Sequence, residues 1–212
     1  MSQTIALETL GCKVNQYESS YFLEVLREAG HRLASFRDSA DVYIVHSCAV
    51  TSKAAYQTRQ LLRRARRRNP EALVMAVGCD AQVESDRIAD EQLATHIIGT
   101  NEKPNVLHWL SVTGSFSGPC KAVGNARGAT ALKPMPITRM HSGRARAFLK
   151  VQDGCDAFCS YCIVPYSRGK SRSLPAEPVH SQLYRYLDSG YREIVLTGIH
   201  LGQWGRDLSP QQ

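Results

Sequence analysis

Three cysteines stand close together in the stretch "DGCDAFCSYC", where Cys155, Cys159 and Cys162 follow a Cys-X3-Cys-X2-Cys spacing. A zinc site prefers four tetrahedral ligands, and neither a histidine nor a fourth cysteine lies close by in the sequence. Two-cluster ferredoxins use a different spacing that ends in Cys-Pro. On a loop after a β-strand, this spacing instead suits a [4Fe–4S] cluster with three ligated irons. The fourth iron is then open to a substrate or cofactor.

A second set of cysteines is spread over the N-terminal half. Cys12, Cys48 and Cys79 each follow a short apolar segment that reads as a strand. The carboxyl ends of parallel strands meet at one edge of a sheet, so we expect these thiols to converge. Free cysteines are often only buried small hydrophobes, which is the alternative. Three equivalent strand ends favour a shared metal site, whereas Cys120 lies outside both sets and is expected to have no role.

The elements that must position these cysteines follow an alternating pattern. We expect strands within residues 4–10, 41–47, 72–78 and 95–99, and helices within residues 15–30, 51–70, 84–92 and 101–110. Nearly continuous apolar strands that alternate with helices predict an α/β fold with a parallel sheet covered on both faces. Asn15 and Glu18 have capping-box spacing, so Asn15 is expected to cap the first helix.

Composition divides the rest of the chain. Residues 113–143 are rich in Gly, Ser, Ala and Pro, which predicts a linker between a domain at residues 1–112 and a second one at residues 144–212. In the second domain, a strand within 146–152, a helix within 177–190 and a strand within 193–199 form another β-α-β unit. The Cys155 loop follows the first of these strands.

Charge and composition narrow the classes of function. The 212 residues carry a formal charge of +7 and seven cysteines, without an apolar run long enough to span a membrane. The N-terminus lacks the features of an export signal, so we expect a cytoplasmic protein with metal or redox chemistry. One expected helix carries six arginines, at positions 59, 63, 64, 66, 67 and 68. They indicate either a solvated basic face or phosphate contacts with RNA.

The motifs resemble those of the radical S-adenosylmethionine methylthiotransferases. "RAFLKVQDGCDAFCSYCIVPYSRGKSRS" is similar to the radical motif of that family, and "TLGCKVNQYES", "VHSCAVTSKA" and "AVGCDAQ" are similar to its three N-terminal cysteine segments. The first of these segments and "EIVLTGIHLGQWGRDL" look most like the MtaB-type branch, which acts on threonylcarbamoyladenosine beside the tRNA anticodon. The resemblance covers nearly all of the chain outside the linker.

The resemblance implies two [4Fe–4S] clusters. Cys155, Cys159 and Cys162 would hold the cluster that chelates S-adenosylmethionine, with Tyr161 against the adenine. Thr197 and Gly198 would lie near the methionine part of that cofactor, although an ordinary strand-to-loop turn explains them equally well.

The resemblance also implies that Cys12, Cys48 and Cys79 hold an auxiliary cluster whose open iron carries the sulfur to be inserted. Arg63, Arg64, Arg66, Arg67 and Arg68 are the candidate RNA contacts. His200 is expected to be an ordinary loop residue. The implied partners are the tRNA anticodon stem-loop and an electron donor such as flavodoxin or ferredoxin.

Members of this family carry a six-unit partial barrel and a TRAM domain. Here about 70 residues follow the expected linker, which is room for two strands and one helix at about 30 residues per unit. We therefore expect a fragment of a longer protein, or a truncated one. Two alternatives to tRNA modification are methylthiolation of a ribosomal-protein side chain and an inactive fragment that binds clusters without catalysis.

Overall fold

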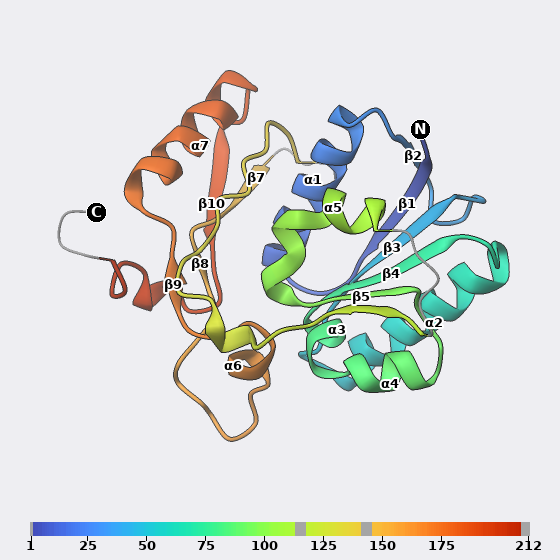
Figure 1. Ribbon diagram of the computed structural model, residues 1–212. Coiled ribbons are helices and arrows are strands. Elements are labelled where there is room, and N and C mark those ends of the chain that lie inside the picture. The colour runs from blue at the N-terminus through green and yellow to red at the C-terminus, as the bar shows by residue number, and fades with distance from the viewer. Residues whose placement is uncertain (1, 113–117, 141–145, 209–212) are drawn as a thin grey trace.

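A six-stranded parallel sheet forms the centre of the computed structural model, which describes residues 2–112, 118–140 and 146–208. The strand order is β2-β1-β3-β4-β5-β6 (Figure 1). The strands are β1 (Thr4–Thr9), β2 (Arg32–Ala34), β3 (Val42–Ser47), β4 (Leu73–Gly78), β5 (His96–Ile98) and β6 (Cys120–Ala122). All pairings within this sheet are parallel, which confirms the predicted α/β class.

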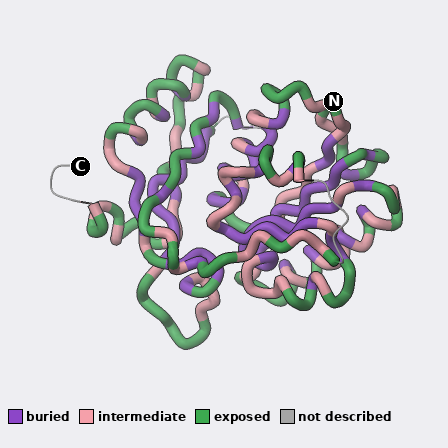
Figure 2. Tube along the Cα trace, in the orientation of Figure 1, coloured by how far each residue is buried: buried purple, intermediate pink, exposed green. Residues whose placement is uncertain are grey.

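Helices cover both faces of the sheet because its strands are apolar on both sides. On one face, Ile44 of β3 packs in the same core as Phe22; on the other, Val45 packs with Leu62. Figure 2 shows these strands as the buried centre of the molecule. The helices of the N-terminal part are α1 (Lys13–Glu28), α2 (Ser52–Arg68), α3 (Cys79–Val83), α4 (Ser85–Asp90), the 3-10 helix η1 (Thr100–Asn105) and α5 (Val106–Ser111).

Part of the segment expected to be a linker forms regular structure and packs on the N-terminal core. Residues 118–140 supply β6, which pairs with β5, and a 3-10 turn η2 (Ala126–Gly128). Beyond that turn, Met135, Ile137 and Met140 are buried in the core that also contains α1. Burial of these apolar side chains holds the segment against the core, although its composition is typical of a loop. Residues 113–117 and 141–143 of the expected linker lie outside the described part of the chain.

The C-terminal part contains the expected β-α-β unit. Its strands β7 (Arg146–Lys150) and β10 (Glu193–Thr197) pair in parallel, and α7 (Ala176–Asp188) connects and covers them. The other elements are α6 (Val164–Ser167), the 3-10 helix η3 (Leu201–Gln203) and a short antiparallel pair, β8 (Gln152–Asp153) with β9 (Arg172–Ser173). The described residues hold two parallel strands and one connecting helix here, as the length of the chain led us to expect, and a barrel is not shown.

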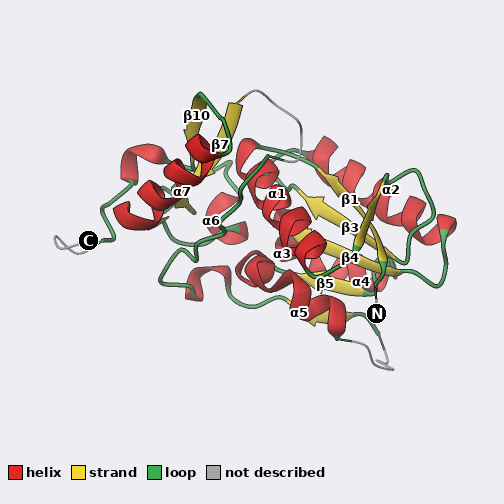
Figure 3. Ribbon diagram, turned by 90° about the horizontal axis from the view of Figure 1, so that it is seen from above, coloured by secondary structure: helices red, strands yellow, loops and turns green. Residues whose placement is uncertain are grey.

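Helix α1 joins the two parts of the molecule. It packs on β1 of the large sheet and also on β7, and Figure 3 shows it between the two. The ammonium group of Lys13 lies 5.9 Å from the ring centre of Phe148 in β7. On the outer face of β7, the hydroxyl of Tyr186 in α7 donates to the carbonyl of Phe148 at 2.7 Å. The orientation of the C-terminal part is therefore set by the first helix of the chain.

Candidate metal centres and the junction between them

Cys12, Cys48 and Cys79 all lie at the carboxyl edge of the large sheet. Cys12 is the residue before α1, Cys48 directly follows β3, and Cys79 is the first residue of α3, directly after β4. The strand pairing places Thr9 beside His46 and Ser47 beside Gly78, so the three strand ends are level. Cys48 and Cys79 are buried, and Cys12 is exposed. The three residues therefore share one edge of the sheet.

Glycine lets the first loop approach the second cysteine. Gly11 has a φ of +98°, and a Cβ built there would lie 2.7 Å from both Cβ and Sγ of Cys48. The backbone of the first loop therefore lies directly against the Cys48 thiol. Burial raises the pKa of this thiol and the charges of Cys79 and Cys12 raise it further, while a backbone hydrogen bond with Val50 opposes them.

Cys79 is positioned by a cap on its short helix. The hydroxyl of Ser47 accepts hydrogen bonds from the backbone N–H groups of Asp80 and Ala81, at 3.1 and 3.2 Å. The same hydroxyl donates to the carbonyl of Val77 at 2.8 Å. Asp80 is 1% exposed, and neither of its carboxylate oxygens has a hydrogen-bond partner among the described residues. Burial raises its pKa to about 6.

Cys155, Cys159 and Cys162 lie on a more exposed loop after β8. The N–H of Cys155 donates to the carbonyl of Gly169, and the N–H of Cys162 donates to that of Cys159. Gly154, with a φ of +75°, has no room for a side chain because a Cβ would lie 1.9 Å from the carbonyl oxygen of Lys170. The adjacent Tyr161 is 90% exposed.

The end of β10 meets this loop. Sγ of Cys155 lies 3.7 Å from Nδ1 of His200, so the histidine expected to be a bystander contacts a candidate ligand. The carbonyl of Thr197 accepts from the N–H of Val151 at 2.9 Å. Gly198 lies against Gln152, where an added Cβ would be 2.9 Å from Oε1.

Gln152 is a residue that the sequence did not single out. It is fully buried, its Oε1 accepts from the N–H groups of Ile199 and His200, and its Nε2 donates to the carbonyl of Gly154. One amide side chain thus fixes the loop of Cys155 against the end of β10. Only its place between a strand and a cysteine loop could have indicated this.

A buried cluster of charges was also missed, and it is centred on Glu18 of α1. The Glu18 carboxylate is fully buried, with Nζ of Lys103 at 2.6 Å, Nζ of Lys150 at 2.7 Å and Nη1 of Arg168 at 3.4 Å. Burial alone would raise its pKa, but these three cations outweigh burial and hold the pKa well below 4.5. Nε2 of His46 lies 3.4 Å away, and burial lowers the pKa of that imidazole to about 4.

Asp153 of β8 completes this charge cluster. Its carboxylate lies 2.8 Å from Nη1 of Arg168 and 3.4 Å from Nζ of Lys150. Burial lowers the pKa of Lys103, and the contact with Glu18 opposes that shift. The cluster joins α1 and η1 of the N-terminal part to β7, β8 and the turn after α6. Buried charges persist only when they are paired, so this junction has a defined arrangement.

The expected cap at Asn15 is wrong. The helix begins at Lys13, so Asn15 lies inside its first turn and is 1% exposed. Its Nδ2 donates to the carbonyls of Leu10 and Ser47, and its Oδ1 accepts from Nη2 of Arg168 at 2.5 Å. The same oxygen lies 3.8 Å from Sγ of Cys12. Asn15 therefore connects the Cys12 loop to the buried charges.

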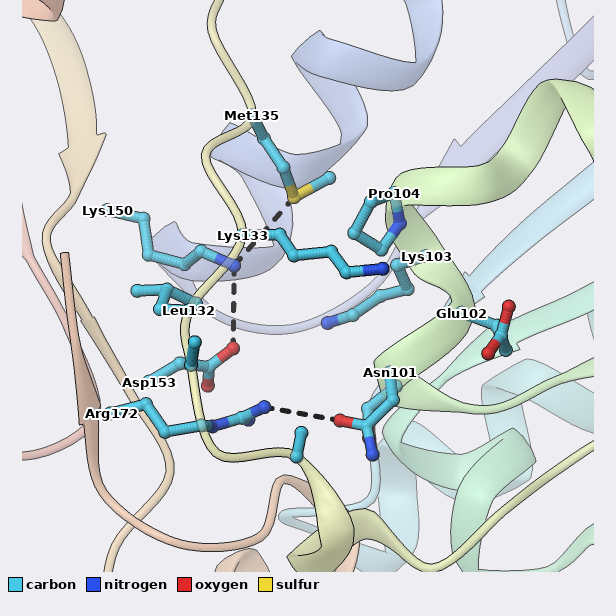
Figure 4. Close-up of a pocket in the computed structure, with 13 residues that line it drawn as sticks. Asn101, Glu102, Lys103, Pro104, Leu132, Lys133, Met135, Lys150, Asp153 and Arg172 are labelled. Atoms are coloured by element: carbon cyan, nitrogen blue, oxygen red, sulfur yellow. Dashed lines mark hydrogen bonds and ion pairs between the residues drawn. The ribbon is translucent and has the colours of Figure 1, made fainter. Parts of the chain in front are cut away.

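A cavity of about 280 Å³ opens beside this cluster rather than beside either set of cysteines. Figure 4 shows Lys103 and Lys150 reaching toward it from opposite sides. Nζ of Lys150 is 3.8 Å from Sδ of Met135, and Nη1 of Arg172 is 3.2 Å from Oδ1 of Asn101. Residues 129–135 of the expected linker thus form one wall of the cavity.

The arginines of α2 differ in their surroundings. Arg63 is paired with Glu91 at 2.5 Å, and the guanidinium of Arg68 donates to the carbonyl of Phe36. Arg64 and Arg67 are exposed. Arg59 and Arg66 are partly buried.

The direction of α2 separates these arginines from the cysteines. The helix begins at Ser52, just after Cys48, and extends for 17 residues, which is about 25 Å at 1.5 Å per residue. The arginine-rich end is therefore far from the carboxyl edge of the sheet. No helix among the described residues is long and apolar enough to cross a membrane.

The two sets of cysteines can be compared with the ligands that a single metal ion needs and with those that an iron–sulfur cluster needs. Among the described residues, no group of three or more His, Cys, Asp or Glu side chains is arranged around one metal ion. Ligands of a [4Fe–4S] cluster bind different irons, so they do not share one centre. Each cysteine set supplies three thiols from separate residues, which fits a cluster with three ligated irons.

Comparison with known proteins gives relatives over nearly the whole chain. Residues 4–99 match the model of "Uncharacterized protein family UPF0004". The chain is 37% identical to "Threonylcarbamoyladenosine tRNA methylthiotransferase MtaB" of Bacillus subtilis over 97% of its length, and 36% identical to the protein of the same name from Aquifex aeolicus over 96%. It is 30% identical to "tRNA-2-methylthio-N(6)-dimethylallyladenosine synthase" of Clostridium botulinum over 96%.

These identities confirm the resemblance expected from the motifs. The chain covers 45%, 49% and 46% of these three relatives, so it spans about half the length of the curated proteins it matches.

Proposed function

We propose that this chain, similar along its length to tRNA methylthiotransferases, carries the cluster-binding parts of such an enzyme of the radical S-adenosylmethionine type. Its substrate would be threonylcarbamoyladenosine beside the tRNA anticodon, which is the nucleoside in the names of the MtaB relatives. The observation that carries the proposal is the pair of cysteine sets, one at the carboxyl edge of the large parallel sheet and one on the loop after β8, joined by one buried junction. The tRNA would place the protein in the cytoplasm.

Each set of thiols would hold one [4Fe–4S] cluster. Cys155, Cys159 and Cys162 would bind the cluster that takes S-adenosylmethionine, and Cys12, Cys48 and Cys79 the auxiliary one. When bound, these groups supply the radical that activates a C–H bond and the sulfur that replaces the hydrogen, chemistry that side chains alone do not provide.

The protein's own contribution is to position the two sites. Gln152 ties the Cys155 loop to the end of β10, and Thr197 and Gly198 would then lie next to the cluster that binds the cofactor. Tyr161 is exposed beside Cys162, where its ring is free to contact an adenine. The charge cluster around Glu18 then holds this unit against the edge that carries the other cysteines. Fixed geometry between two reacting groups is a large part of catalysis.

The domain boundaries at residues 112 and 144 belong to the same proposal, with residues 1–112 binding the auxiliary cluster. RNA contact would fall to Arg64 and Arg67, the exposed members of the arginine helix, at a distance from the modified base. Arg63, Arg66 and Arg68 would contribute less because each is partly buried. An electron donor such as flavodoxin or ferredoxin would reduce the cluster on the exposed Cys155 loop.

Anaerobic reconstitution tests the proposal. We expect about eight irons per chain, which corresponds to two [4Fe–4S] clusters. Cys48→Ala and Cys159→Ala should each lower the count to about four, while Cys120→Ala serves as the matched control and should retain both clusters. Reduced protein should cleave S-adenosylmethionine and add a methylthio mass to tRNA that carries threonylcarbamoyladenosine.

The outcomes separate the candidate functions. Fewer than about four irons in the unaltered protein would refute both cluster assignments. Eight irons without cofactor cleavage would show a cluster-binding protein without catalysis. Cleavage with methylthiolation of a ribosomal protein, and none of tRNA, would refute the substrate assignment.

A further inference from the structure

Arg168 lies between the buried charges and the auxiliary cysteines. It is 2% exposed and follows α6 in the C-terminal part. One side of its guanidinium faces Asp153 and Glu18, and the other side donates to Asn15 at 2.5 Å. The same Asn15 oxygen lies 3.8 Å from Sγ of Cys12, so one side chain links the guanidinium to a candidate ligand. An arginine cannot lose its proton in a protein, so this positive charge is permanent.

The buried groups leave this charge incompletely balanced. Three cations, Lys103, Lys150 and Arg168, share two carboxylates, those of Glu18 and Asp153. The neighbouring His46 adds no charge at neutral pH, because burial lowers its pKa to about 4. The two lysines point to Glu18 and the cavity, whereas Arg168 contacts Asn15, whose Oδ1 lies next to Sγ of Cys12.

A cluster held by three thiolates is an anion that would lie against this guanidinium. Hydrogen bonds and nearby charges are among the factors that set the reduction potential of an iron–sulfur cluster. A fixed cation favours the more negative, reduced form. Arg63, Arg64, Arg66, Arg67 and Arg68 of α2 lie toward the far end of that helix, away from the cysteines.

We propose that Arg168 is a positioning and charge-compensating residue for the auxiliary cluster, and that it raises the reduction potential of that cluster. This inference rests on the proposed function. Because Arg168 belongs to the C-terminal part, its charge reaches the cysteine edge only when the two parts are docked. The potential of the auxiliary cluster would then depend on the junction.

Redox titration of each cluster by itself tests the inference. Cys159→Ala would leave only the auxiliary cluster, and Cys48→Ala only the other one. In the first background, Arg168→Gln should lower the ratio of reduced to oxidised cluster about tenfold at a fixed potential, which corresponds to about 59 mV for one electron. In the second background the same substitution should cause a smaller shift.

Three further variants exclude a general structural effect. Arg168→Lys keeps the charge and should stay close to the unaltered potential. Glu18→Gln removes a buried negative charge and should shift the potential upward, opposite to Arg168→Gln. Arg172→Gln is the matched control, because this buried arginine of the same segment contacts Asn101 and backbone carbonyls instead of thiols.

The sign of the shifts decides the outcome. Opposite shifts for Arg168→Gln and Glu18→Gln support the inference, and either variant alone decides it if the other does not fold. Equal shifts, no shift, or a shift in Arg172→Gln as large as in Arg168→Gln would overturn it. The proposed function fails separately, by absence of the two clusters in the unaltered protein.

Discussion

Replacement of Gly11 by alanine tests how closely the first cysteine loop packs on the second. The new Cβ would lie 2.7 Å from Cβ and Sγ of Cys48 and 3.3 Å from Nδ2 of Asn15. Asn15 cannot yield, because it is held by the carbonyls of Leu10 and Ser47 and by Arg168. The Cys48 side chain must therefore shift, which changes its position relative to the other two cysteines.

The structure allows the two costs of this change to be separated. An alanine with a φ near +98° costs about 1–2 kcal/mol in backbone strain. Overpacking against Cys48 adds about 1–3 kcal/mol. Gly30→Ala is the matched control: its φ is +84°, and no heavy atom lies within 4 Å of the added Cβ, so it pays only the first cost.

The assay combines urea unfolding of the cluster-free protein with iron counts after anaerobic reconstitution. We expect the free energy of unfolding of Gly11→Ala to be lower than that of Gly30→Ala by about 1–3 kcal/mol, the cost of overpacking against Cys48. We also expect it to retain about four irons, while Gly30→Ala retains about eight. Equal stability and equal iron content in the two variants would refute the placement of Cys48 against the Gly11 loop.

Three further perturbations address other parts of the site. Gly154→Ala should lose the cluster of the Cys155 loop because a Cβ there meets backbone 1.9 Å away, whereas Gly190→Ala, also at positive φ but with open space around it, should keep it; iron counts decide. Glu18→Gln should destabilise the protein by about 3–5 kcal/mol at pH 7 in urea unfolding. Since the folded pKa of Glu18 is depressed, its contribution is present above pH 4.5 and is lost as the pH falls further, so the variant should lack this acid-dependent loss. Removal of the exposed charges in Arg64→Gln and Arg67→Gln should weaken RNA binding and reduce its salt dependence, by a slope of about 0.7–0.9 per lost phosphate contact, and an unchanged slope would exclude these residues from the interface.

The elements with long, regular patterns were predictable from the sequence. The apolar runs of β3 and β4 and the amphipathic repeat of α2 are local signals, and their observed bounds lie within the expected ranges. Convergence of Cys12, Cys48 and Cys79 at one sheet edge followed from the geometry of parallel strands.

The junction was not predictable, because its contacts are remote in sequence. Glu18 meets Lys103, Lys150 and Arg168 at separations of 85, 132 and 150 residues. The spacing of Asn15 and Glu18 suggested a helix that begins after Asn15. The same two residues also fit inside a helix that begins three residues earlier, as it does here. The three-residue strand β6 was missed for a related reason: it is too short to show a period and lies in a loop-like composition.

The large sequence separation between Glu18 and Arg168 has a consequence for synthesis on the ribosome. At about 5–20 residues per second, Arg168 emerges on the order of ten seconds after Glu18. Until then, the Glu18 carboxylate lacks the contact with Arg168, and its described partners within the N-terminal part are Lys103 and the uncharged His46. The contact of Arg168 with Asn15, beside Cys12, can therefore form only after Cys155, Cys159 and Cys162 have been synthesised.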